Sequence, residues 1–248
     1  GHVGGAMSMV EILLTLYQHV MDIDPKDPKK ADRDRMILSK GHGGVGICPV
    51  LADAGYYEED FMADFNQYLS PFGMHPDMNK VPGIDMSSGS LGHGLSIGVG
   101  LCIGARLNKE SWRSFVVLGD GECNEGSVWE AAMSASHYKL GNLTAIVDRN
   151  NLMIDGPTEE IMSIEPIEDK WKAFGFETKV INGHDYNQLL DTFENLPGPD
   201  SEKPVCIICN TVKGKGISYM ENETKWHYGG LDEDSEKAAI ADIEKMSF

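Results

Sequence analysis

The sequence predicts an α/β fold in which a mostly parallel sheet carries helices on both faces. Short apolar runs typical of strands alternate along the chain with segments of helical spacing, and such alternation is typical of βαβ units. The chain has 248 residues, of which 41% are hydrophobic and 24% are charged. That length and composition suit one globular core, so we expect a single domain over residues 1–248.

Up to residue 107 the sequence predicts four helices and one short strand. Apolar residues at helical spacing follow Ser8, which we expect to cap the first helix. Pro and Gly are frequent from residue 70 to residue 90, where we expect a long ordered loop of the kind that often carries function. A short strand is predicted at 35–39. Helices are predicted at 8–21, 46–54, 58–69 and 93–107, the last of them closely packed and buried.

The second half shows the clearest alternation of strands and helices. Strands are predicted at 115–118, 143–148, 177–181 and 204–210. Helices are predicted at 125–138, 165–174 and 186–196. Parallel strands end at one edge of their sheet, which is where open α/β sheets bind ligands.

Charge and cysteine usage exclude several classes of protein. The formal net charge of -18 repels nucleic acid and anionic membrane surfaces, so we expect neither as a partner. The five cysteines lack a disulfide-scaffold spacing, and no signal peptide or long apolar span is recognisable, which favours a cytoplasmic location. Cys206 and Cys209 lie three apart in a predicted strand, so they should point to opposite faces and not share a metal ion.

The strongest local signal is Gly119-Asp120-Gly121, which follows an apolar strand and leads toward a helix. Such a tripeptide alone is often only a tight turn. A second apolar strand, however, ends near Asn150. Amide donors at a helix start suit a diphosphate, and carboxylate and amide oxygens suit the Mg²⁺ that commonly bridges phosphates. We therefore expect a metal-bound diphosphate at this edge of the sheet.

These paired motifs resemble the thiamine diphosphate signature, in which Gly-Asp-Gly and a later Asn hold the diphosphate through a divalent metal. Further motifs, which cover nearly the whole chain, are similar to those of transketolases. They are Gly1-His2-Val-Gly-Gly, Ser39-Lys-Gly-His42, Met74-His75-Pro-Asp, Ser88-Gly-Ser-Leu-Gly92, Glu125, and the stretch from Lys213-Gly-Lys-Gly to Trp226-His227.

The resemblance implies a role for each matching residue. The Mg²⁺ ligands would be Asp120, Asn150 and the main-chain carbonyl of Leu152, with Ca²⁺ or Mn²⁺ as possible substitutes. The diphosphate would be approached by Gly119, Gly121, His42 and His227. The aminopyrimidine and thiazolium region would be lined by Gly89 and Leu91. The substrate channel would be faced by His2, His75 and His227. Glu125 would be the acidic residue near a subunit interface.

The resemblance also implies a partner and a reaction. Transketolases carry a pyrimidine-binding domain, with a glutamate that activates the cofactor, and a C-terminal domain; here we expect both on a separate partner chain in an α₂β₂ assembly. The pair would transfer a two-carbon ketol unit between sugar phosphates. A sulfonated or apiose-derived sugar is an alternative substrate.

Two other classes of function compete with this interpretation. Gly41-His-Gly43-Gly-Val-Gly46 fits the GxGxxG fingerprint of nicotinamide-binding folds, but the acidic residues 58–60 do not end a strand as the ribose-binding acid should. The other alternative is a regulatory or inactive subunit that binds thiamine diphosphate without catalysis.

Overall fold

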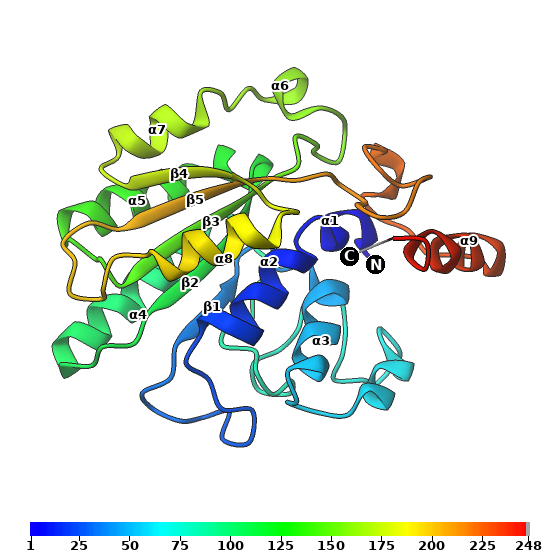
Figure 1. Ribbon diagram of the computed structural model, residues 1–248, viewed down its shortest axis with the longest axis horizontal. Helices are drawn as coiled ribbons and strands as arrows, with labels where there is room; N and C mark the ends of the chain where they lie inside the picture. The colour runs from blue at the N-terminus through cyan, green and yellow to red at the C-terminus, as the bar shows by residue number, and fades with distance from the viewer. Residues whose placement is uncertain (247–248) are drawn as a thin grey trace.

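The computed structural model describes residues 1–246 and contains a five-stranded sheet in the order β1-β2-β3-β5-β4 (Figure 1). The strands are β1 (Arg35–Leu38), β2 (Ser114–Gly119), β3 (Leu143–Arg149), β4 (Glu177–Asn182) and β5 (Val205–Asn210). Every neighbouring pair is parallel. The predicted α/β fold with a parallel sheet is therefore confirmed.

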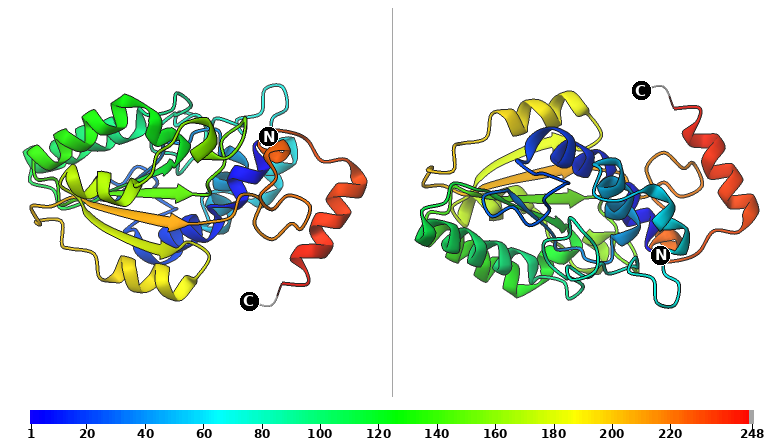
Figure 2. Two further views of the ribbon diagram at one scale, coloured as in Figure 1. Left: turned by 90° about the horizontal axis from the view of Figure 1, so that it is seen from above. Right: turned by 90° about the horizontal axis from the view of Figure 1, so that it is seen from below.

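Helices cover both faces of this sheet, as Figure 2 shows in the view from above. One layer consists of α1 (Val3–Met7), α2 (Val10–Thr15), α3 (Gly44–Asp53) and α8 (Tyr186–Glu194). The other consists of α4 (Gly94–Asn108), α5 (Gly126–His137) and α7 (Ile167–Ala173). Alternate residues of β2 explain the two cores: Phe115 and Val117 join the first cluster, whereas Val116 and Leu118 join the second.

The same alternation separates the two cysteines of β5. Cys209 belongs to the core on the α8 side, and Cys206 to the core on the α5 side. Both thiols are fully buried, and burial raises the pKa of each above its usual range. The expectation that these two side chains point to opposite faces is confirmed.

The first predicted helix is wrong at its start. Helical structure begins at Val3, breaks around Ser8, resumes as α2 and ends in a π-helical turn over Leu16–Val20. Ser8 is not the N-cap that the sequence suggested but the C-cap residue of α1, and its hydroxyl donates to Asp148 Oδ2 at 2.6 Å. A long-range acceptor buried in the sheet thus replaces the local capping contact that the sequence suggested.

Other boundaries differ where backbone geometry intervenes. The predicted helix 58–69 is only a 3₁₀ turn over Glu59–Asp64, since Asn66 and Leu69 then adopt positive φ. Only one face of α4 is closely packed: a Cβ on Gly98 would lie 2.7 Å from Val116, whereas Gly100 and Gly104 meet nothing within 4 Å.

Besides α1, two further α-helices were not predicted. They are α6 (Thr158–Ile161) and α9 (Glu233–Ile243). Of α9, only Ala239 is buried, and it packs on Ile217 and Met220. Across residues 1–246, no helix has both the length and the apolar character that spanning a bilayer would require.

The start of the chain pairs with a segment near its end. The amino group of Gly1 donates to Gly229 O at 2.7 Å, and Gly229 N–H donates back to Gly1 O at 3.0 Å. This pairing brings His2 next to His227, although the two are far apart in sequence.

Candidate active site

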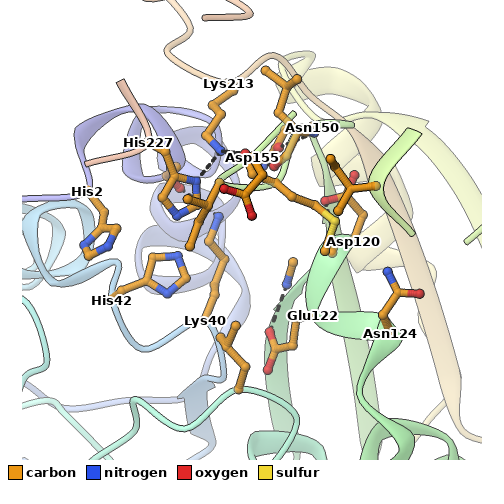
Figure 3. A pocket seen from close by; sticks show the side chains of 18 of the residues that line it. His2, Lys40, His42, Asp120, Glu122, Asn124, Asn150, Asp155, Lys213 and His227 are labelled. Carbon is orange, nitrogen blue, oxygen red and sulfur yellow. Dashed lines mark hydrogen bonds between the residues drawn. The ribbon is translucent and has the colours of Figure 1, made fainter. Parts of the chain in front are cut away.

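A cavity of about 450 Å³ opens at the carboxyl edge of the sheet (Figure 3). The ends of β1, β2 and β3 and the turn before α5 contribute to its walls. All the site residues predicted from the sequence line this one cavity: His2, His42, His75, Gly89, Leu91, Gly119, Asp120, Gly121, Glu125, Asn150, Leu152 and His227. The structure therefore brings together residues from motifs far apart along the chain, while their individual roles stay predictions.

Asp120 lies where β2 ends and a 3₁₀ turn over Gly121–Asn124 begins. Its side chain is 2% exposed and accepts two backbone N–H groups, from Gly121 at 2.8 Å and from Asn151 at 2.7 Å. Burial and the nearby Asp148 carboxylate raise the pKa of Asp120 to about 6. The carboxylate is held in place, but its negative charge is only partly compensated by the residues around it.

Asn150 follows β3 and is oriented by its neighbours. Its Nδ2 donates to Asp148 at 3.3 Å, and its Oδ1 accepts the N–H of Leu152 at 3.2 Å. Asp148 is itself fully buried; burial raises its pKa, but Lys40 and hydroxyl donors, including Thr211, outweigh this and lower the pKa below its usual range. A charged Asp148 thus fixes which way the Asn150 amide faces.

Three histidines meet on the opposite wall of the cavity. The ring centroids of His2 and His42 are 4.7 Å apart, and each lies within 6 Å of the His227 ring. Burial, together with nearby lysines, lowers the pKa of His42 to about 3 and that of His227 to about 4. Burial also lowers the pKa of His2, whose buried Nδ1 finds no hydrogen-bond partner within the described residues. The lowered pKa values make these imidazoles neutral at pH 7.

Glycines allow the loops of the cavity to approach one another closely. A Cβ on Gly41 would lie 2.5 Å from Gly89 N, and one on Gly89 would lie 3.1 Å from the His75 ring. These two positions therefore keep the loop after β1, the loop at 88–92 and His75 in contact.

Residues 1–243 match the family described as transketolase, thiamine diphosphate binding domain. The chain belongs to the transketolase family. The predicted membership of this family and the thiamine diphosphate-binding domain are thereby confirmed.

Two curated relatives resemble the chain over most of their own length. It is 40% identical over 243 residues to an apulose-4-phosphate transketolase subunit of Phocaeicola vulgatus, covering 98% of this chain and 86% of that protein. It is 41% identical over 245 residues to a 6-deoxy-6-sulfo-D-fructose transketolase subunit of Clostridium sp. strain MSTE9, covering 99% and 89%.

Among solved structures, the transketolase from Leishmania mexicana superposes with a TM-score of 0.82 at 28% identity, covering 99% of this chain. The chain spans 41% of that longer transketolase.

Two buried lysines of this transketolase domain were not predicted as site residues from the sequence. Lys40 is 3% exposed and pairs with Asp148 while donating to Gly5 O at 2.7 Å. Lys213 is 1% exposed; its Nζ lies 2.6 Å from His227 Nδ1 and 3.1 Å from Leu152 O. Burial lowers the pKa of Lys213 to about 8. Both side chains line the cavity, so its wall combines two cationic groups with neutral imidazoles.

The nicotinamide-binding alternative finds no support in this transketolase fold. Gly41–Gly46 does connect β1 to α3, as the fingerprint would require. The acidic residues 58–60, however, lie at the start of a 3₁₀ turn and not at the end of a strand. The ribose-binding acid is therefore misplaced in space as well as in sequence.

The neutral histidines predict sensitivity to acid. An unfolded histidine takes up a proton below about pH 6.5, whereas His42 stays neutral down to about pH 3, so stability should fall as the pH falls through that window. We expect His42 to account for about 1–2 kcal/mol of the loss between pH 6.5 and pH 5. Urea unfolding at both pH values should show a smaller loss for His42→Gln, while His19→Gln, at an exposed histidine, should behave as wild type. Equal losses for all three proteins would contradict the argument.

Proposed function

We propose that this chain is the diphosphate-binding half of a two-chain transketolase, which transfers a two-carbon ketol unit from a ketose to an aldose through thiamine diphosphate. The observation that carries the proposal is one cavity in which the oxygen donors of Asp120, Asn150 and Leu152 face a cluster of neutral histidines. Membership of the family supports the cofactor.

The oxygen donors suit Mg²⁺. A carboxylate, an amide oxygen and a main-chain carbonyl are the hard ligands that this ion prefers. A cation beside Asp120 would offset the burial and the repulsion by Asp148 that together raise the pKa of that side chain. Within residues 1–246 no three His, Cys, Asp or Glu side chains gather as a metal cluster, which agrees with a site built on one carboxylate and neutral oxygens. We propose Mg²⁺ held by Asp120, Asn150 and Leu152 O, with Ca²⁺ or Mn²⁺ as substitutes.

The histidines would bind and orient the parts of the diphosphate and of the sugar that the metal does not contact. An ammonium can only donate, so the charged Lys213 makes Nδ1 of His227 an acceptor and leaves the proton on Nε2. His227 would then donate to the diphosphate or to a substrate hydroxyl, with His42 beside it on the diphosphate.

On the substrate side, His2 and His75 would contact the hydroxyls of the sugar. Gly89 and Leu91 would line the thiazolium region, and Glu125, exposed at the start of α5, would face the partner. Thiamine diphosphate, when bound, supplies the carbon nucleophile that accepts the ketol unit.

Alanine at any one of His2, His42, His75 or His227 is expected to lower turnover. A positioned acid or base contributes about 10²–10⁴-fold to rate, and we expect losses of that order. Initial rates of ketol transfer by the complex with the partner subunit measure the effect, with the exposed His137→Ala as the matched control. Near-normal turnover of all four variants would contradict the assigned roles.

The identity of the donor sugar can be determined by comparing rates with different ketoses. Ordinary pentose phosphates are the default donors, but the two relatives are named for apulose 4-phosphate and 6-deoxy-6-sulfo-D-fructose. We therefore propose that a non-standard ketose is the alternative donor. Rates measured with D-xylulose 5-phosphate, apulose 4-phosphate and 6-deoxy-6-sulfo-D-fructose on the same complex would rank the candidates. Cofactor binding without transfer from any donor would instead favour an inactive, regulatory subunit.

A further inference from the structure

Glu122 is a buried acid that none of the roles above uses. It lies in the 3₁₀ turn after Asp120, is 3% exposed, and sits at the floor of the cavity between Lys40 and Asn124 in Figure 3. Its carboxylate accepts three hydrogen bonds: Oε1 from the Ser39 hydroxyl and from Gly92 N–H at 2.9 Å, and Oε2 from Gly119 N–H at 3.0 Å. A buried carboxylate costs free energy unless such donors satisfy it.

The three donors belong to three different segments of the cavity wall. Ser39 directly follows β1 and leads into Lys40 and His42. Gly92 ends the loop that carries Gly89 and Leu91. Gly119 is the last residue of β2, directly before Asp120. One side chain thus connects the proposed metal ligand to both loops expected to face the cofactor.

Further contacts restrict the position of Gly92 and extend this hydrogen-bond network. Gly92 has a left-handed φ of 82°, and a Cβ there would lie 2.6 Å from the Cβ of Glu125. Its carbonyl accepts from the Ser127 hydroxyl of α5 at 3.0 Å, so both backbone polar groups of Gly92 are held, one by the 3₁₀ turn and one by α5. The Ser39 hydroxyl in turn accepts Gly94 N–H at 3.1 Å, which extends the connection to α4.

We propose that Glu122 is a positioning residue that sets the relative placement of Asp120, the 88–92 loop and the Lys40–His42 segment for cofactor binding. This inference rests on the proposed function, because it takes the cavity to be the thiamine diphosphate site. Glu122 acts through its neighbours' backbone and contacts no reacting atom.

The substitution Glu122→Gln separates hydrogen bonding from packing. Glutamine has almost the same volume, so a purely space-filling role would be preserved. Its amide offers one acceptor oxygen and one NH₂ group. Whichever way the amide is turned, the NH₂ faces a backbone N–H, that of Gly92 or that of Gly119, and at least one of the connections is lost.

The experiment compares wild type, Glu122→Gln and a matched control, Asp34→Asn. Asp34 is also 3% exposed and accepts backbone and Arg113 donors, but it precedes β1 at the opposite edge of the sheet. Two readouts are needed: amide hydrogen exchange of peptides spanning 88–95 and 114–121 in the cofactor-free chain, and calorimetric affinity for thiamine diphosphate with Mg²⁺ in the complex with the partner subunit.

For Glu122→Gln we expect faster exchange in one or both peptides and cofactor affinity about 10–100-fold weaker, as for other partners that orient metal ligands. Asp34→Asn should lower the unfolding midpoint yet keep the wild-type affinity. Wild-type affinity and exchange in Glu122→Gln would overturn the inference, whereas failure of the wild-type complex to bind the cofactor would overturn the proposed function itself.

If Glu122→Gln does not fold, Ser39→Ala, which removes one donor, decides by the same two readouts: weaker affinity supports the inference and unchanged affinity overturns it.

Discussion

Replacing Asp120 by alanine is expected to weaken thiamine diphosphate binding by more than about 100-fold, beyond the loss that residues orienting a metal ligand usually cause. Asp120 is the single anion among the three proposed metal ligands. Without it, only two neutral oxygens of this chain would be left to hold a doubly charged ion. Turnover should fall with cofactor occupancy, since the diphosphate would lose the ion that holds it.

The alanine variant should still fold. Two N–H groups, of Gly121 and Asn151, lose their acceptor, but the repulsion between the Asp120 and Asp148 carboxylates is removed at the same time. Calorimetry with Mg²⁺ present, on the complex with the partner subunit, measures the affinity. Asp155→Asn is the matched control, because Asp155 is a carboxylate of the same cavity outside the proposed ligand set. Unchanged affinity in Asp120→Ala, or an equal loss in Asp155→Asn, would argue against this metal site.

The sheet was predictable because its strands carry their own signal. Phe115 to Leu118 and Leu143 to Val147 are buried on both faces, so each run is apolar, apart from Thr144, and is bounded by polar or small residues. Helix α9 carries almost no such signal, since Ala239 is its one buried residue. Near Ser8 the sequence was misleading, because the acceptor of its hydroxyl, Asp148, lies far away in the chain.

The candidate site was predictable for a related reason. Gly119-Asp120-Gly121 and the histidines beside Gly or Pro form short motifs, and a motif can be recognised without knowing its neighbours in space. Lys40 and Lys213 could not be placed in this way: their partners Asp148, Leu152 and His227 are brought to them by the fold. The stretch Lys213-Gly-Lys-Gly marked the region, but no local pattern indicates which of its lysines is buried.

Exposed apolar side chains at the mouth of the cavity support the need for a partner subunit. Large apolar side chains stand exposed around it: Leu91 at 37%, Ile154 at 65% and Ile161 at 46%, with Met162 close by at 59%. Surfaces of this kind usually mark a binding interface. We call these four exposed side chains the rim. We propose that the chain carrying the pyrimidine-binding domain covers the rim, so that the cofactor lies between the two subunits.

We expect the purified chain to show no ketol transfer by itself, even with saturating Mg²⁺ and thiamine diphosphate, and to gain full activity when the partner subunit is added. The proposed chemistry needs a glutamate that activates the aminopyrimidine, and that group is expected on the partner. The interface should be of the obligate kind, beyond about 2,000 Å².

Rim variants test the same idea from this chain's side. Ile154→Ser and Met162→Ser should raise the partner concentration needed for half-maximal activity, because each removes apolar area that the interface would bury. Val180→Ser is the matched control: Val180 is also an exposed apolar residue, 42% exposed, but it lies on the edge strand β4 and does not line the cavity. Full activity of the chain before any partner is added would refute the split site and would place the activating glutamate within this chain.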